Sequence, residues 1–157
     1  MGTLVTIMLA GLLTSIPQSD AAPTRLLDAV SLLRQSASGI QVALGPPVRT
    51  TTVPAGDFQL PMGGYSRLYQ HHDATIDVDF ANERSTTVRV SFSDSAAAPR
   101  TYAAALEAVG LRADSPPDLT RRSFREWKSL DGYVVQVVAD PSADHIDVVV
   151  LSVDATP

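Results

Sequence analysis

The chain has 157 residues and contains no cysteine. Disulfides, thiol catalysis, zinc–thiolate sites and a lipidated cysteine anchor are therefore excluded. Small secreted domains often depend on disulfides, but a domain of this size buries roughly two-thirds of its surface on folding and does not need them. We expect one domain held together by an ordinary hydrophobic core.

Basic residues are also scarce, because 12 Lys and Arg stand against 17 Asp and Glu, for a net charge of −5. A protein that binds nucleic acid needs a basic surface to neutralise phosphates. We therefore expect no nucleic-acid partner.

Long apolar runs are missing too. Leu4 to Ile16 is an uninterrupted stretch of uncharged, mostly apolar residues, and it is shorter than the roughly 20 apolar residues that span a bilayer. Its length suits the core of a signal peptide, and Ser19 and Ala21 supply the small residues of a cleavage site. No Lys or Arg precedes the core, which departs from the usual pattern. We expect a signal peptide at 1–21 and a secreted or periplasmic domain at 22–157, with no stable membrane anchor after cleavage.

Catalytic signatures are absent from the sequence. It holds no G-x-S-x-G elbow, no H-E-x-x-H zinc motif, no P-loop and no G-x-G-x-x-G fingerprint. The sequence gives no reason to expect an enzyme, and we expect no cofactor.

Helix and strand periodicities cover most of the remaining chain. "TRLLDAVSLLRQ" has helical spacing, and Ser38 with Gln41 forms a capping-box pattern for a second helix that Gly45 ends. Later segments alternate apolar and polar residues with period two, which is typical of half-buried strands. The predicted helices are 24–35, 39–44 and 99–110, and the predicted strands are 48–53, 65–70, 74–80, 86–92, 122–130, 133–139 and 145–153.

These elements predict an α+β fold in which helices pack on one face of an antiparallel sheet. "VVVL" in the last strand is apolar on both faces, so we expect that strand to be central. Asp131-Gly132 favours a tight hairpin. The two halves of the chain repeat one order of elements, which indicates a possible αβββ pseudo-duplication.

The helical entry "LLRQSASGIQVALGPP", followed by antiparallel strands, resembles the small exported α+β proteins of the outer-membrane-assembly lipoprotein and β-lactamase-inhibitor-protein type. The resemblance implies a helix-backed sheet that binds proteins. The chain departs from those families because it has neither a lipidation cysteine nor a disulfide pair.

The stretch "RLYQHHDATIDVDF" contains the densest set of metal-ligand side chains. On an extended chain, however, His71 and His72 point to opposite faces. If 81–85 is a loop, Asp77 lies opposite Arg89, which makes an ordinary cross-strand ion pair. We therefore interpret the stretch as a polar turn and a wet sheet face, with no metal site.

The aromatic residues and their basic neighbours are the candidate binding residues. They are Tyr65, Arg67, Tyr69, Arg125, Trp127 and Tyr133. On an open sheet face they would resemble an interface hot spot; they could instead cap the core under the helices or line a small-ligand site. We expect Trp127 to lie opposite Gln136 and to be partly exposed.

The sequence as a whole favours a non-catalytic exported binding protein that acts on a protein partner, as an inhibitor, immunity or assembly factor. Two alternatives remain open. One is a small-ligand-binding protein, and the other is a metal-dependent hydrolase that uses the His71/His72 region.

Overall fold

The computed structural model describes residues 25–57, 60–93, 98–142 and 145–153. The predicted signal peptide, 1–21, lies outside these residues. The described chain forms three short helices and eight strands: α1 (Ala29–Leu32), α2 (Ala37–Leu44), β1 (Arg49–Val53), β2 (Gly64–His71), β3 (Ala74–Ala81), β4 (Arg84–Phe92), α3 (Tyr102–Ala108), β5 (Leu119–Arg121), β6 (Phe124–Leu130), β7 (Tyr133–Ala139) and β8 (Ile146–Val153).

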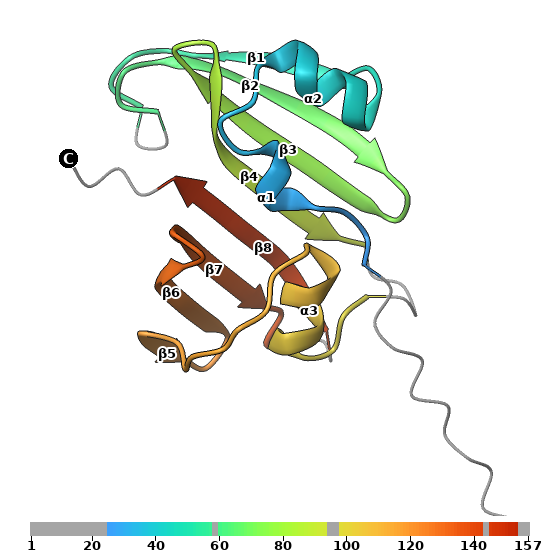
Figure 1. The fold of residues 1–157 in the computed structure, drawn as a ribbon, viewed down its shortest axis with the longest axis vertical. Coiled ribbons are helices and arrows are strands. Elements are labelled where there is room, and N and C mark those ends of the chain that lie inside the picture. The colour runs from blue at the N-terminus through green and yellow to red at the C-terminus, as the bar shows by residue number, and fades with distance from the viewer. Residues whose placement is uncertain (1–24, 58–59, 94–97, 143–144, 154–157) are drawn as a thin grey trace, which may run out of the picture.

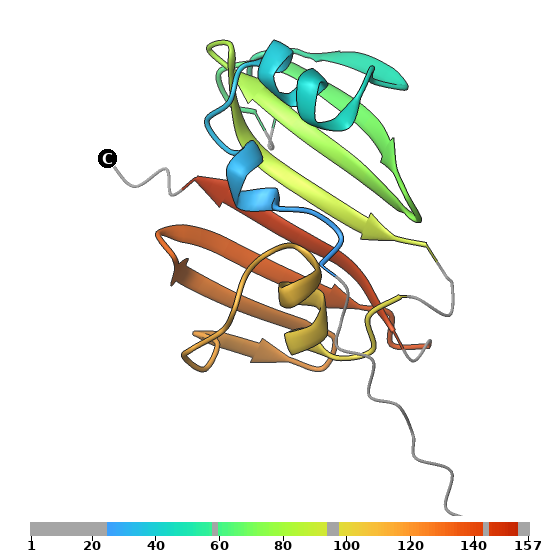
Figure 2. The same ribbon diagram turned by 45° about the vertical axis from the view of Figure 1, so that its right-hand side comes forward.

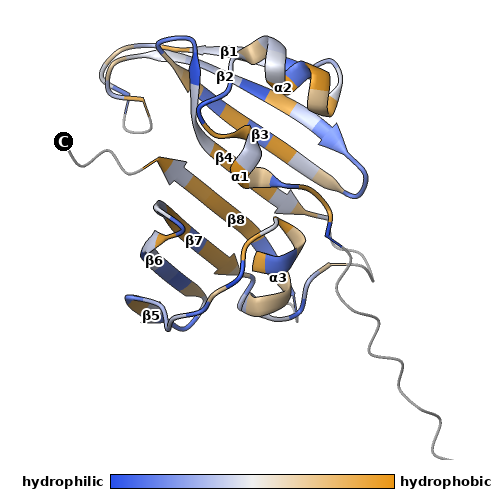
Figure 3. Ribbon diagram, in the orientation of Figure 1, coloured by the Kyte–Doolittle hydropathy of each residue, from blue (hydrophilic) through white to orange (hydrophobic). Residues whose placement is uncertain are grey.

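All eight strands belong to one antiparallel sheet in the order β1-β2-β3-β4-β8-β7-β6-β5 (Figure 1). Each half of the chain forms a four-stranded meander, and the last strands of the two meanders, β4 and β8, pair at the centre. The expectation that the VVVL strand is central is confirmed. Figure 3 shows β8 hydrophobic over most of its length.

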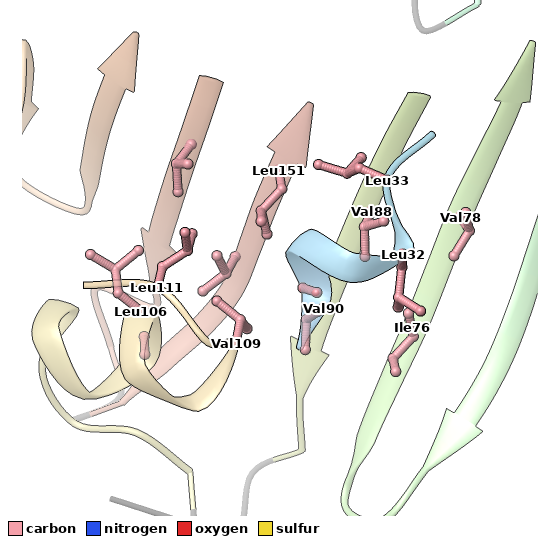
Figure 4. Close-up of a cluster of buried hydrophobic side chains, with 14 of the residues drawn as sticks. Leu32, Leu33, Ile76, Val78, Val88, Val90, Leu106, Val109, Leu111 and Leu151 are labelled. Carbon is pink, nitrogen blue, oxygen red and sulfur yellow. The ribbon is translucent and has the colours of Figure 1, made fainter. Parts of the chain in front are cut away.

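The three helices lie on the same face of the sheet, as both ribbon views show (Figures 1 and 2). Helix α2 contacts β2, α1 contacts β4 and α3 contacts β8. Leucines of the α1 and α3 regions pack onto valines of the central strands (Figure 4). The fold is therefore α+β with one antiparallel sheet, as the periodicities predict.

Tight two-residue turns connect the strands of two hairpins, and a bulge shifts the register beyond each turn. The two central residues of each turn have the left-handed backbone that a two-residue hairpin requires. The φ angles are 49° at Asn82 and 62° at Glu83 in one turn, and 53° at Asp131 and 81° at Gly132 in the other. Asp77 lies opposite Arg89, as expected. The turn is Asn82-Glu83 rather than the expected loop 81–85, and a bulge between Asp79 and Phe80 restores the expected pairing of Asp77 with Arg89.

The helix ends differ from the predictions because backbone contacts across the fold override local periodicity. The predicted helix 24–35 forms only over Ala29–Leu32, since the amides of Leu26 and Leu27 instead donate to the carbonyl of Ala108. Ser36, rather than Ser38, caps α2. The predicted strand 122–130 forms over Phe124–Leu130 as β6, and β5, which precedes it at Leu119–Arg121, was not predicted.

Within the part of the chain that the structure describes, no helix is both long and apolar enough to cross a membrane.

Candidate functional site

The candidate site is the face of the sheet that none of the described helices covers, which we call the helix-free face. On β3 and β4, Ile76, Val78, Val88 and Val90 face the helices and are fully buried. Period-two alternation therefore directs their neighbours to the other side. The strand pairing sets three rows across that face: Ser66–Asp79–Thr87–Ser152–Val134; Leu68–Asp77–Arg89–Val150–Gln136–Glu126; and Gln70–Thr75–Ser91–Val148–Val138–Phe124.

The β2–β4 part of this face is a charged cluster. Arg89 lies 3.4 Å from the Asp77 carboxylate and 3.7 Å from that of Asp79. The hydroxyl of Ser66 donates to Asp77. The carboxylates of Asp77 and Asp79 lie on the same face of β3, so the single Arg89 guanidinium forms ion pairs with both. With two acidic groups and one basic group, the cluster carries a net negative charge.

Asp79 is the most enclosed member of the cluster, with 2% of its surface exposed. Burial raises the pKa of its carboxyl group above the ordinary value of 3.8, and this effect outweighs the attraction of Arg89, which lowers the pKa. The negative charge of Asp77 raises the pKa further. The cluster therefore contains a carboxylate that holds its proton more tightly than a solvated one.

The β6–β8 part of the same face is mainly apolar. Val148 and Val150 of β8 lie beside Val138 of β7, and Phe124 of β6 follows Val138 across the sheet. All four side chains are half-buried. The polar interruption is the Gln136 amide, which donates to the Glu126 carboxylate at 2.8 Å. This part of the face offers valine and phenylalanine surface to a partner.

A groove of about 460 Å³ lies at one end of the helix-free face. Leu60, Pro61, Met62 and Gly63 of the β1–β2 connection form one wall, and Met62 is 84% exposed. The other wall consists of small and apolar side chains from the central strands: Ala81, Thr86, Thr87, Val134, Ser152 and Val153. The groove is open, and the described residues that line it are all uncharged.

The six candidate binding residues lie on the helix side of the sheet, the placement that the sequence left open beside an open sheet face. Tyr65, Arg67 and Tyr69 alternate with Ser66 and Leu68 on β2, so they point to the helix side. Arg125, Trp127 and Tyr133 also point there, because Trp127 pairs with the fully buried Val135. Tyr69 is fully buried.

The expected exposure of Trp127 is wrong, because 4% of its surface is accessible. Its indole N–H donates to the carbonyl of Ser115 at 3.0 Å. Trp127 lies opposite Val135 rather than Gln136, since a bulge between Trp127 and Leu130 shifts the register set by the turn. Trp127 is a core residue and offers a partner almost no surface.

The adjacent histidines also differ from expectation. Their rings meet edge to face, with centroids 4.4 Å apart, rather than diverging. His72 begins the β2–β3 turn with a φ of 50°, so the chain there is not extended. His145 lies at 3.2 Å from Asp147 on β8. Among residues 25–57, 60–93, 98–142 and 145–153, no three His, Asp or Glu side chains are placed to hold a metal ion together.

Sequence reasoning missed the helix-free face as a candidate site. The available signal was the alternation in β7 and β8, where "YVVQVVA" and "DVVVLS" place valines on both faces. A strand that is apolar on both faces can be covered on both sides or can present one apolar face. Only the position of the helices tells which applies here.

Comparison with known proteins identifies the fold and no more. No protein-family model and no curated protein matches the sequence. Among solved structures, an extracellular protein containing a SCP domain from Bacillus anthracis str. Ames is similar, with a TM-score of 0.53 and 11% identity over 93% of this chain and 50% of that chain. A cysteine-rich secretory protein from Staphylococcus aureus subsp. aureus Mu50 has a TM-score of 0.52 and 10% identity over 79% of this chain and 45% of that one.

These similarities correct the resemblance to assembly lipoproteins and β-lactamase inhibitors, which is wrong. That resemblance depended on a helix followed by antiparallel strands, an order that many α+β folds share. Here two meanders meet in one eight-stranded sheet. The chain spans about half the length of the two structures it matches, and it is similar in fold to bacterial extracellular proteins of the SCP type.

Proposed function

We propose that this chain is a non-catalytic exported binding protein whose partner is a folded protein domain seated on the helix-free face. The observation that carries the proposal is the half-buried apolar surface of Val138, Val148, Val150 and Phe124, which no described helix covers. Apolar surface flanked by charge is typical of sites where proteins associate. The Asp77–Asp79–Arg89 cluster supplies the polar flank.

The structural neighbours support both the kind of partner and the export. They are an extracellular protein and a secretory protein, and the matching fold accounts for about half of each chain. In those proteins the fold thus occurs together with further polypeptide. We therefore propose a secreted or periplasmic location, and a folded extracellular domain rather than an unfolded peptide as the partner.

We also propose that the chain arose as an αβββ pseudo-duplication. The strand order supports this proposal, because β1–β4 and β5–β8 take equivalent places on either side of the β4–β8 pair. Helices α1 and α3 contact β4 and β8, the corresponding strands of the two halves.

A face-specific cross-linking experiment tests the protein-binding function. The photoreactive residue p-benzoylphenylalanine replaces Phe124 on the helix-free face or Tyr133 on the helix side, in the bacterium that produces the protein. We expect one discrete cross-linked protein from position 124 and none from position 133. Equal cross-linking from both positions, or none from position 124, would refute the proposal.

A pair of substitutions within one row of the sheet sharpens this test. Val148→Asp places a charge in the apolar part of the face and should abolish the cross-link from position 124. Ser91→Asp, directly opposite on β4, places the same charge in the polar part and should leave the cross-link intact. Thermal unfolding of both variants establishes that they are folded. If both variants cross-link like the wild type, the apolar surface is not the contact.

The groove favours a second candidate function, the binding of a small apolar ligand. Its volume of about 460 Å³ lies in the range of about 300–1,000 Å³ that small-molecule sites occupy. Val134→Trp would fill the groove from β7. An apolar fluorescent probe such as 1-anilinonaphthalene-8-sulfonate should bind saturably to the wild type and not to this variant. Equal binding to both proteins would exclude the groove as the site.

A further inference from the structure

Arg67 of β2 is held by two aromatic rings on the helix side of the sheet. Its guanidinium carbon lies 5.4 Å from the ring centroid of Tyr65 and 5.9 Å from that of Phe80. These two rings stack with centroids 4.8 Å apart and an interplanar angle of 13°. Phe80 is fully buried. A rigid pair of rings therefore fixes the position of the charge.

The hydrogen-bonding groups of Arg67 have no acceptor within the described residues. Its Nε atom is buried and unpaired, and Arg67 takes part in none of the ion pairs formed by those residues, such as Arg25–Asp28 and Arg89–Asp77. A buried donor without an acceptor destabilises a fold unless something else satisfies it. Arg67 therefore presents an unused planar set of donors.

Arg125 in the other half of the sheet shows that stacking alone does not leave an arginine unpaired. Its guanidinium carbon lies 4.5 Å from the ring centroid of Tyr102 on α3. Its Nη1 atom donates to the carbonyls of Arg121 and Phe124, the latter at 2.9 Å. Both arginines lie on the helix side of the second strand of their meander. Of these two arginines, Arg67 alone has a buried nitrogen, Nε, without an acceptor among the described residues.

A second unpaired donor lies on the same strand face. The hydroxyl of Tyr69 is buried and has no partner among the described residues. Tyr69 follows Arg67 by two residues, so both side chains leave β2 on the helix side, about 7 Å apart along the strand. Two neighbouring unpaired donors, one of them cationic, call for an acceptor that carries negative charge.

We propose that Arg67 is the centre of a binding site for a carboxylate, with the Tyr69 hydroxyl as a second donor. The planar guanidinium binds a carboxylate through two parallel N–H···O bonds, which a lysine cannot reproduce. The stack of Tyr65 and Phe80 holds the guanidinium in place before the ligand arrives, so little conformational entropy is lost on binding. The site is separate from the helix-free face and does not depend on the partner proposed for that face.

Side-chain NMR of the arginines tests the site directly. Acetate is titrated into the full mature protein at constant ionic strength while the Nε–Hε signals of Arg67 and Arg125 are followed. We expect a saturable shift of the Arg67 signal and no saturable shift of the Arg125 signal. Equal movement of both signals, or a linear drift of Arg67, would overturn the proposal.

Two substitutions test whether binding depends on the two-pronged geometry of the guanidinium or only on its positive charge. Acetate binding is followed through the NMR signals of the Tyr65 ring. Arg67→Lys keeps the charge and should weaken acetate binding by about tenfold or more, the change expected when a charge-assisted hydrogen bond is lost. Arg125→Lys should leave it unchanged. Amide spectra and unfolding midpoints of both variants show that they are folded. Unaltered acetate binding by Arg67→Lys would exclude Arg67 as the centre.

A phosphate titration decides the class of oxyanion. Inorganic phosphate at the same ionic strength should bind more weakly than acetate, because the proposed ligand is a planar carboxylate. Tighter binding of phosphate would overturn the carboxylate assignment. Tyr69→Phe should also weaken acetate binding, and unchanged affinity would remove the hydroxyl from the site.

Discussion

The two meanders of the sheet have the same order of strands but present opposite chemistry on the helix-free face. The first half presents Asp77, Asp79 and Arg89, whereas the second presents Val138, Val148 and other apolar side chains. Both halves bury the opposite face beneath helices. A shared architecture therefore constrains the covered face, because packing decides it, and leaves the uncovered face to differ.

The helix sides of the two halves differ in how their polar atoms are satisfied. In the second half, Trp127 and Arg125 both donate to backbone carbonyls. In the first half, Arg67 and Tyr69 each keep a buried donor without an acceptor among the described residues. The buried polar groups of Trp127 and Arg125 in the second half are therefore hydrogen-bonded, whereas those of Arg67 and Tyr69 in the first half are not. Substitutions in the two halves should therefore differ in their effect on stability.

Removal of Trp127 should cause the largest loss of stability. Trp127→Ala leaves a cavity in the core beside Ser115 of the α3–β5 connection and should lower the free energy of unfolding by about 3–5 kcal/mol. Urea denaturation measures this loss. Phe124→Ala on the same strand is the matched control, and it should cost less because Phe124 is half-exposed on the helix-free face. Equal losses would contradict the difference between the two faces.

Ser85 joins α1 to the first half of the sheet. Its hydroxyl donates to the carbonyl of Leu32 at 2.5 Å and accepts from the amide of Gln35 at 2.9 Å, and Ser85 is 1% exposed. Ser85→Ala leaves both backbone groups unpaired and should cost about 1–3 kcal/mol of unfolding free energy. Ser91→Ala on the same strand should cost almost nothing. Equal effects would show that the Ser85 hydroxyl does not hold α1.

Asp79 should give the first half an unusual dependence on pH. Because folding raises the pKa of Asp79, the native state binds this proton more tightly than the unfolded state does. Its contribution to stability is fully present below the unfolded pKa, near 3.8, and is lost as the pH rises through the folded pKa. Asp79→Asn should therefore stabilise the protein at pH 7, by on the order of 1 kcal/mol.

The measurement for Asp79 is the difference in unfolding free energy between variant and wild type from pH 7 to pH 3.5. The gain from Asp79→Asn should shrink as the pH falls, because the wild-type carboxyl group then becomes neutral too. A gain that grows towards low pH would mean that folding lowers the pKa of Asp79, and that Arg89 outweighs burial.

Tyr69→Phe should have the smallest effect on the free protein. The substitution removes a buried hydroxyl that has no partner and keeps the ring in the core. We expect unchanged stability or a gain of up to about 1 kcal/mol, in contrast to most core substitutions. Thermal unfolding without added carboxylate measures it. A loss of about 1 kcal/mol or more would show that the hydroxyl has an acceptor, and that the two halves are equally satisfied.

Much of the fold was predictable because its signals are local. The alternation of Ile76, Val78, Val88 and Val90 marks the buried face, and the Asp131-Gly132 turn marks a hairpin. Helix ends were less predictable, since Leu26 and Leu27 bond to Ala108, far away in the sequence. The candidate site was the least predictable part. Tyr65, Arg67 and Tyr69 were identified as a group, but the sequence could not choose between an open face and the helix side on which they lie.

The sequence by itself determined where most helices and strands lie, the Asp131-Gly132 hairpin and the central place of β8, because turn chemistry and apolar periodicity act over a few residues. Only the tertiary structure decided which face of the sheet the helices cover. A strand with apolar residues on both faces has the same sequence pattern whichever face the helices cover. A bulge after Trp127 also changes its cross-strand partner from Gln136 to Val135, and no local sequence pattern predicts that bulge. The burial of Trp127 beside Ser115 and the position of Arg67 beside Phe80 depend on residues 12 or more positions away in the chain, so no local pattern predicts them.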